Sequence, residues 1–217
     1  MRANFDKQLS LLDHEMIEMG AMCEEVIALS ASALKSGDIS LAQKVAPLDK
    51  QIDRKERDIE SLCLKLLLEQ QPVARDLRQI SAALKMITDL ERIGDQAEDI
   101  AEIVMFLNGR GDDGKTRIKE MAEATIKMVT DSVDAYVRRD ILLAQAVIEY
   151  DDVVDGCFLS VKTKLIELIA AGCADGEYAL DLLMIAKYFE RIGDHATNLA
   201  EWVIYAVTGV HKSEEDG

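Results

Sequence analysis

The sequence predicts an all-α protein built as tandem duplicated three-helix bundles, with six long antiparallel helices. The composition favours helices, because only 5% of the residues are aromatic, two are proline, and the apolar residues are mostly Leu, Ile, Ala, Val and Met. The duplication is visible in the pentapeptide ERIGD, which occupies residues 91–95 and again residues 190–194. Residues 91–102 and 190–201 are identical at eight of twelve positions.

A second pair of matching blocks lies upstream of the first. Residues 38–53 and 140–155 are identical at eight of sixteen positions and are offset by 102, whereas the ERIGD blocks are offset by 99. Two blocks in the same order at nearly the same offset indicate a duplicated unit of about 100 residues, the usual size of one domain. We therefore expect one three-helix bundle in residues 1–110 and a second in residues 111–217.

Three helices are expected in the first half, because apolar residues recur there every three or four positions. They cover about residues 5–35, 41–70 and 73–107. Gly37 is expected to end the first helix, and Asp38 is expected to be the N-cap of the second. Pro47 lies inside the second pattern and predicts a kink or a break, and Pro72 ends that helix.

The second half repeats this plan after a linker at residues 108–114, which contains three glycines and no apolar side chain. Helices are expected at about residues 116–138, 141–171 and 177–207. The loop at 172–176 replaces residues 71–74 of the first half and accounts for the changed offset. The tail after Gly209 is polar, and we expect it to be loose.

The charge and hydropathy of the chain exclude several functions. With 41 acidic and 25 basic residues the net charge is −16, which argues against nucleic-acid binding and fits cations or basic protein surfaces. No apolar run approaches the roughly 18 residues of a membrane span, and no signal peptide is recognisable. We expect a soluble cytoplasmic protein without direct membrane insertion. The cysteines form no CxxC pair and are predicted to be small core or half-buried residues in a reducing compartment: Cys23, Cys63, Cys157 and Cys173.

Two rows of carboxylates are the most distinctive polar feature of the first half. Both have the spacing i, i+4, i+7, i+11, which places four side chains on one strip of a helix. The rows are Asp49, Asp53, Glu56 and Glu60, and Glu91, Asp95, Glu98 and Glu102. An antiparallel helix pair would face them across one groove rich in carboxylate oxygens, which hard cations prefer. A solvated acidic face is the alternative, and both interpretations stay open.

The corresponding rows of the second half are thinner. Phe158 and Lys162 replace two of the acids on one helix, and Thr197 and Asn198 replace Glu98 and Asp99 on the other. The remaining acids are Asp151, Asp152, Asp155, Glu190, Asp194 and Glu201. Because affinity for a hard cation rises with the number of anionic oxygens, we expect the two sites to be unequal.

Other residues of the ERIGD blocks are predicted to have structural roles. A glycine inside a helix costs about 1 kcal/mol relative to alanine, so Gly94 and Gly193 indicate close helix approach. Arg92 and Arg191 are expected to neutralise nearby acids. His195 is matched by Gln96, so we expect a surface histidine or one that supports a ligand, since a required ligand would occur in both halves.

No set of residues in the sequence indicates catalysis. There is no ExxH pair of the kind that builds di-iron sites in helical bundles, and no glycine-rich phosphate loop. There is also no Ser/His/Asp or Cys/His arrangement that would predict a nucleophile. The protein is therefore not expected to be an enzyme.

At these residues the sequence resembles the PhoU family. The resemblance rests on the two ERIGD blocks with their continuations QAEDIAE and HATNLAEW, on RDLRQI at residues 75–80, and on Met19 with Gly20. It implies paired three-helix bundles that bind multinuclear metal clusters on their surface through E(D)xxxD motifs. It also implies a protein that restrains the phosphate-starvation response and links the ATPase subunit of a phosphate ABC transporter to a sensor histidine kinase.

Carried over residue by residue, the resemblance implies the metal ligands. The motif pairs Asp49 with Asp53, Glu91 with Asp95, Asp95 with Asp99, Asp151 with Asp155, and Glu190 with Asp194. Glu56 joins this set from the acid row, and Asn198 replaces an acid but keeps an oxygen that can coordinate. Iron, zinc, magnesium and manganese are candidate ions. The ion, the nuclearity, homodimerisation and direct sensing of phosphate are left open.

Three classes of function are therefore in competition. A signalling adaptor binds its partners without turnover. A metal-binding bundle with storage or metalloenzyme activity would show redox or hydrolytic chemistry, and would prefer histidine ligands that the rows lack. A purely structural helical module would have acids that are only solvated.

Overall fold

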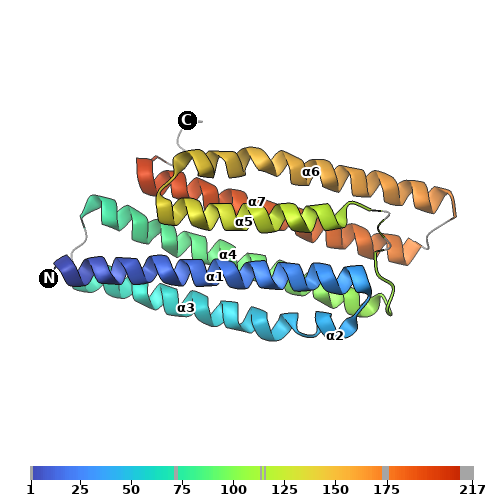
Figure 1. Ribbon diagram of the computed structural model, residues 1–217, viewed down its shortest axis with the longest axis horizontal. Helices are drawn as coiled ribbons and strands as arrows, with labels where there is room; N and C mark the ends of the chain where they lie inside the picture. The colour runs from blue at the N-terminus through green and yellow to red at the C-terminus, as the bar shows by residue number, and fades with distance from the viewer. Residues whose placement is uncertain (1, 71–72, 113, 115, 173–175, 211–217) are drawn as a thin grey trace.

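The computed structural model describes residues 2–70, 73–112, 114, 116–172 and 176–210 of the 217-residue chain. This part of the chain contains helices and no strand, which confirms the all-α prediction (Figure 1). The helices are α1 Arg2–Ser36, α2 Ile39–Ala42, α3 Val45–Gln70, α4 Ala74–Phe106, α5 Ile118–Arg138, α6 Ile141–Ala170 and α7 Gly176–Thr208. The six long helices agree with the predicted ones, and α2 is an additional short helix.

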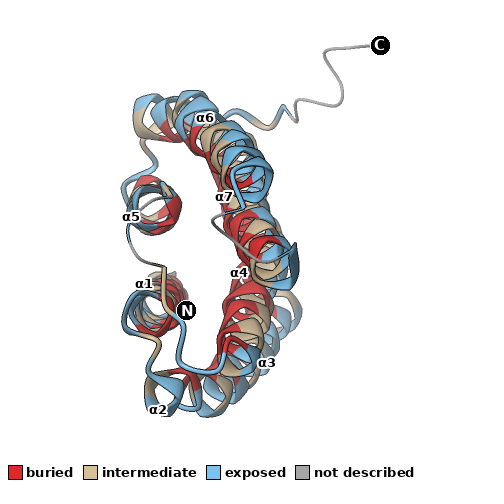
Figure 2. Ribbon diagram, turned by 90° about the vertical axis from the view of Figure 1, so that its right-hand side faces the viewer, coloured by how far each residue is buried: buried red, intermediate tan, exposed pale blue. Residues whose placement is uncertain are grey.

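The long helices form two layers. Figure 2 shows α3, α4, α7 and α6 as a curved layer, with α1 and α5 packed against its inner side. Helices α1, α3 and α4 contact one another, as do α5, α6 and α7, which is the predicted arrangement of two three-helix groups. The most extensive contact joins the two groups through α4 and α7. The division into domains at residues 110 and 111 stays a prediction.

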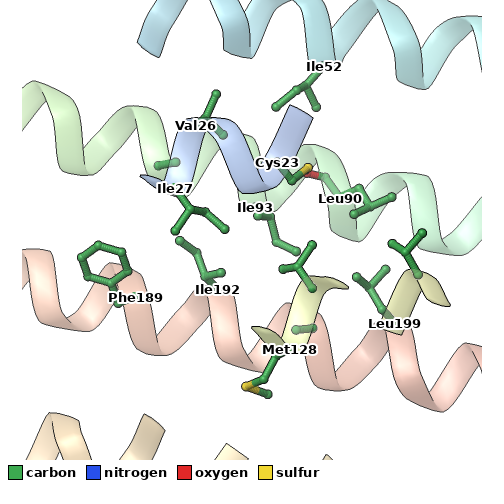
Figure 3. Close-up of a cluster of buried hydrophobic side chains, with 14 of the residues drawn as sticks. Cys23, Val26, Ile27, Ile52, Leu90, Ile93, Met128, Phe189, Ile192 and Leu199 are labelled. Carbon is green, nitrogen blue, oxygen red and sulfur yellow. The ribbon is translucent and has the colours of Figure 1, made fainter. Parts of the chain in front are cut away.

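The core runs without interruption through both halves. Figure 3 shows Val26 of α1, Ile52 of α3, Ile93 of α4, Met128 of α5 and Phe189 of α7 in one buried cluster. Each is at most 1% exposed, so each contributes roughly 1.5–3 kcal/mol of hydrophobic free energy. The apolar periodicity of the sequence thus identifies the inner face of every long helix.

The predicted burial is confirmed for the three cysteines that the structure describes, and the reducing compartment stays a prediction. Cys23, Cys63 and Cys157 are buried and free. The Cys23 thiol donates to the carbonyl oxygen of Leu90 at 3.3 Å, and burial raises the pKa of Cys63 to about 12. These thiols are therefore inert packing groups at neutral pH. Cys173 lies outside the described residues.

The turn after α1 forms as the sequence predicts. Gly37 has a φ of 68°, and the Asp38 carboxylate accepts from the Ser40 N–H at 2.8 Å. The predicted disturbance near Pro47 is a break, because α2 ends at Ala42 and α3 starts at Val45. Pro47 therefore lies in the first turn of α3, where its missing N–H has no helical partner to lose.

The linker packs across the end of α1. The N–H of Asp112 donates to the carbonyl oxygen of Leu34 at 3.0 Å, and the hydroxyl of Tyr178 donates to the carbonyl oxygen of Gly111 at 2.8 Å. A Cβ added to Gly37 would clash with the carbonyl group of Gly109. A glycine-rich segment is thus needed because two backbones meet here.

Two other expectations fall largely on undescribed positions. The loop at residues 172–176 is described only at its two ends, and the tail is described only as far as Val210. Within the described ranges, no helix is both long enough and apolar enough to cross a membrane.

Candidate metal centre

In the first half, α4 carries a glycine directly beneath a buried carboxyl group of α3. A Cβ added to Gly94 would lie 2.6 Å from Oδ1 of Asp49 and 3.1 Å from Cδ1 of Ile52. Asp49 is only 5% exposed, and its Oδ1 has no hydrogen-bond partner. The close approach predicted from Gly94 is confirmed, and its cause is more specific than expected, since the glycine makes room for a carboxylate.

The second half repeats this arrangement between α6 and α7. A Cβ on Gly193 would lie 2.9 Å from Oδ1 of Asp151 and 3.4 Å from Cγ1 of Val154. Asp151 matches Asp49 in the duplicated sequence, and Gly193 matches Gly94. The pairing of one carboxyl group with one glycine is therefore a property of the duplicated unit.

The electrostatics of the first groove show that the two acid rows face each other. Burial raises the pKa of Asp49 together with the negative charges of Glu98, Asp53 and Asp95, and the resulting value is about 7. Glu98 and Asp95 belong to α4, so acids of both helices act on the one carboxyl group of Asp49.

Acids farther along the groove are coupled in the same way. Burial raises the pKa of Glu56, with repulsion from Glu60 and Asp53. Burial also raises the pKa of Glu91, and the charges of Asp95, Glu56 and Asp53 add to it. Repulsion between α3 and α4 acids is expected only if both rows share one groove, as the helical spacing predicted.

The ligand types and the charge of this groove fit a hard cation. A cation would replace the Asp49 proton, pair with its unpartnered Oδ1, and relieve the repulsion between the rows. No three or more His, Cys, Asp or Glu side chains in the described part of the chain are gathered closely enough to hold a metal ion as they stand. The groove thus supplies the right atoms without a preformed coordination sphere, and metal binding stays a prediction.

The second groove has the same character with fewer acids. Burial is the main cause that raises the pKa of Asp151 to about 6, and the negative charges of Asp155, Asp194 and Glu190 are the next causes. Burial also raises the pKa of Asp194, while Lys187 opposes that shift. The two clusters of coupled carboxylates therefore correspond position by position.

Basic side chains pair with acids of both grooves. Arg92 pairs with Asp95 at 2.8 Å and with Glu91 at 3.5 Å, which confirms the neutralising role predicted for it. In the second half Lys187 pairs with Glu190. The repeat gave no sign of Lys187, because its counterpart is Thr88 and the duplicated motif does not include this position.

Similarity to known proteins identifies the family. The family model described as PhoU domain matches residues 16–104 and again residues 118–203, which together cover most of the chain. The chain belongs to the PhoU family. The two matches correspond to the two halves that the internal repeat indicates.

Relatives of similar length carry the same name. The chain is 37% identical over 210 residues to a "Phosphate-specific transport system accessory protein PhoU homolog" of Clostridium acetobutylicum, with 96% of each sequence covered. The Pseudomonas aeruginosa homologue of that name is 36% identical, covering 94% of this chain and 86% of the relative.

Solved structures agree with the fold. The crystal structure of PhoU from Pseudomonas aeruginosa has a TM-score of 0.84 at 36% identity, covering 95% of this chain and all of that one. The structure of "the phosphate transport system regulatory protein PhoU" from Streptococcus pneumoniae has a TM-score of 0.87 at 25% identity, covering 95% and 98%. The predicted PhoU resemblance is confirmed.

Nine of the eleven predicted ligands of this PhoU chain line the two grooves. The first groove contains Asp49, Asp53, Glu56, Glu91 and Asp95. The second groove contains Asp151, Asp155, Glu190 and Asp194. Glu98 belongs to the predicted acid row but not to the family motif, and its negative charge raises the pKa of Asp49, which places it in the first groove as well.

The two remaining predicted ligands lie at the contact between α4 and α7. Asn198 donates from Nδ2 to Oδ1 of Asp89 at 3.2 Å. Burial raises the pKa of Asp99, and the nearby charge of Arg191 of α7 partly opposes this shift. Asp99 and Asn198 are equivalent in the repeat, so both halves direct this position toward the other half.

His195 belongs to the same contact. Its Nδ1 lies 2.9 Å from Oδ1 of Asp89, which agrees with the expectation that it is not a required ligand. Asp89 was missed, because its counterpart in the repeat is Tyr188 and no acid spacing includes it. Only the packing of α4 on α7 reveals that Asp89 joins the two halves.

Proposed function

We propose that this PhoU chain is a negative regulator of phosphate uptake and of the phosphate-starvation response. It acts in the cytoplasm as an adaptor between the ATPase subunit of a phosphate ABC transporter and a sensor histidine kinase. The observation that carries this proposal is similarity over nearly the whole chain to proteins named as phosphate transport accessory proteins. The helical fold shared with a protein named as a phosphate transport regulator supports it.

The proposed role requires binding surfaces and no turnover. The relatives are named accessory and regulatory proteins. Of the two described histidines, His14 pairs with Glu18 on the surface at 3.3 Å, and His195 pairs with Asp89 outside both grooves. The grooves thus lack the mixed ligand sets of redox or hydrolytic centres, and no observation favours the storage or metalloenzyme alternative.

The adaptor proposal predicts a defined phenotype and a defined pair of partners. Deleting the gene should switch on a phosphate-starvation reporter in phosphate-replete medium, and the intact chain should restore repression. Affinity purification from phosphate-replete cells should recover the transporter ATPase or the kinase. Normal repression in the deletion strain, or turnover of a phosphate ester or redox substrate by the purified protein, would contradict the proposal.

We also propose that both grooves bind metal cations, with magnesium, manganese, iron and zinc as the candidates. Asp49, Asp53, Glu56, Glu91 and Asp95 would hold the ion in the first groove, with Glu98 beside them. Asp151, Asp155, Glu190 and Asp194 would hold it in the second, with weaker support from Asp99 and Asn198 at the edge. The bound cation would neutralise the carboxylates and draw the paired helices together.

The two grooves should differ in affinity. Glu56 and Glu98 have Phe158 and Thr197 as counterparts, so the first groove offers more anionic oxygens. Calorimetric titration with each cation, together with metal analysis, should show a larger loss of cation affinity for Asp53→Asn/Asp95→Asn than for Asp155→Asn/Asp194→Asn. Equal losses would refute this ranking, and no binding by the unmodified protein would refute both sites.

A further inference from the structure

A small cavity lies at the end of the molecule where α4 begins and where α5 and α7 end, at the left in Figure 1. Its volume is about 140 Å³. Arg75 and Gln79 of α4 line it together with Tyr136 and Arg139 at the end of α5, against an apolar wall of α7 that includes Val203 and Val207. None of these residues belongs to the acid grooves.

The backbone at Arg139 is unusual for an arginine. Its φ is 57°, in the left-handed region where glycine is favoured. The equivalent turn of the first half has Gly37 there with a φ of 68°, and an aspartate N-cap follows in both halves. The duplicated turn therefore accepts glycine, yet the second half holds an arginine against its conformational preference, which suggests a role for the side chain.

A chain of hydrogen bonds holds the Arg139 side chain at the cavity. Its Nη2 donates to Oε1 of Gln79 at 2.5 Å, and Nε2 of Gln79 donates to Oδ1 of Asp13 at 2.9 Å. Gln79 is 5% exposed, so this link is fixed. Because Gln79 stands between them, Arg139 is oriented without being directly paired to the carboxylate of Asp13, and further guanidinium donors stay available.

The local charge is positive in a protein that is strongly negative overall. Arg75 is exposed, and Nε of Arg78, three residues farther along α4, is buried without a hydrogen-bond partner. The N-terminus of α4, which carries partial positive charge, has no side-chain cap from Val73. Three acids are close in sequence or bonded to the pocket: Asp13, which is bonded to Gln79, the buried Asp76, and Asp140, whose carboxylate accepts from the Leu143 N–H at the start of α6.

The equivalent position at the other end of the molecule is closed by the chain itself. Gly37 replaces Arg139 there and Tyr178 replaces Gln79. The carbonyl group of Gly109 packs against Gly37, and the carbonyl oxygen of Gly111 accepts from Tyr178. The pseudo-symmetric fold thus fills one of the two equivalent positions with its linker and lines the other with arginines.

We propose that this arginine pocket, formed by Arg75, Gln79, Tyr136 and Arg139, binds a small tetrahedral oxyanion of the phosphate type. A liquid water molecule occupies about 30 Å³, so the cavity of about 140 Å³ has room for about five heavy atoms, which is the size of one tetrahedral oxyanion. A guanidinium group offers paired N–H donors that match two oxygens of such an anion. Two guanidinium groups at one cavity would clamp it from two sides.

The test is calorimetric titration of the full metal-free chain with inorganic phosphate, after chelation has removed cations that could hold phosphate in the grooves. The unmodified protein should bind one phosphate saturably. Arg139→Gly, which reproduces Gly37 and fits the left-handed backbone, should weaken binding by at least about tenfold, as should Arg75→Gln. Arg138→Gln is the matched control, because Arg138 is paired with Asp134 at 2.7 Å and lies outside the cavity.

Two further outcomes decide the proposal. Sulfate should compete with phosphate, because guanidinium donors recognise shape and charge and cannot detect the phosphate proton. Arg139→Gly should retain the melting temperature of the unmodified protein, so that lost binding is not lost folding. The absence of saturable binding, an equal loss in Arg138→Gln, or failure of sulfate to compete would overturn the assignment.

Discussion

Gly94→Leu should lower the free energy of unfolding by about 3 kcal/mol or more, since overpacking a core contact costs 1–3 kcal/mol and a buried acid is displaced as well. A side chain at this position meets Oδ1 of Asp49 at 2.6 Å and Cδ1 of Ile52 at 3.1 Å. The better helix propensity of leucine returns only about 1 kcal/mol. Chemical denaturation of the metal-free protein would measure the difference.

The chain offers matched comparisons for this substitution. Gly193→Leu should also destabilise, but less, because its nearest contacts are 2.9 Å and 3.4 Å. Gly156 lies inside α6 with nothing within 4 Å of an added Cβ, so Gly156→Ala should stabilise by about 0.5–1 kcal/mol. Equal stability of Gly94→Leu and the unmodified protein would show that α3 does not approach α4 as the structure describes.

Asp49→Asn should stabilise the metal-free protein at pH 8 by up to about 4 kcal/mol. The folded-state pKa of Asp49 is about 7, against an ordinary value of 3.8. A raised carboxyl pKa means that folding favours the protonated form of Asp49. The contribution of this group to the free energy of unfolding is therefore complete below pH 4 and is lost as the pH rises to 7. The folded-state pKa and the ordinary pKa differ by about three, which corresponds to about 4 kcal/mol at 1.36 kcal/mol per pKa unit. The asparagine amide removes the charge and can donate to Glu98.

The pH dependence supplies the control. Unfolding measured at pH 4 and pH 8 should show the advantage of Asp49→Asn only at the higher pH. Asp151→Asn should give a smaller advantage, because the pKa of Asp151 is about 6 and its side chain is less buried. A saturating concentration of divalent cation should make the unmodified protein more stable than Asp49→Asn, since the unmodified carboxylate then becomes a ligand. A pH-independent difference would show that Asp49 is ionised without penalty.

Local sequence information predicted the elements of this fold well. Apolar spacing of three and four identified the three long helices of the first half, the repeat placed the three of the second half, and the same spacing placed the acid rows of α3 and α4 beside the core face. The Gly37 stop and the Asp38 cap were also predictable, because turn and cap preferences depend on a few adjacent residues. The repeat predicted that α6 and α7 would reproduce the groove of α3 and α4, and they do.

The sequence by itself therefore determined the helices, their inner faces, the duplication and the composition of the acid rows. The tertiary structure alone decided that Gly94 lies beneath Asp49, that Asp99 and Asn198 turn toward the opposite half, and that Arg139 meets Arg75 at one end. The reason is that helical spacing specifies which residues share a face of one helix. Which helix lies opposite, and how closely, depends on how side chains distant in sequence fill one common core.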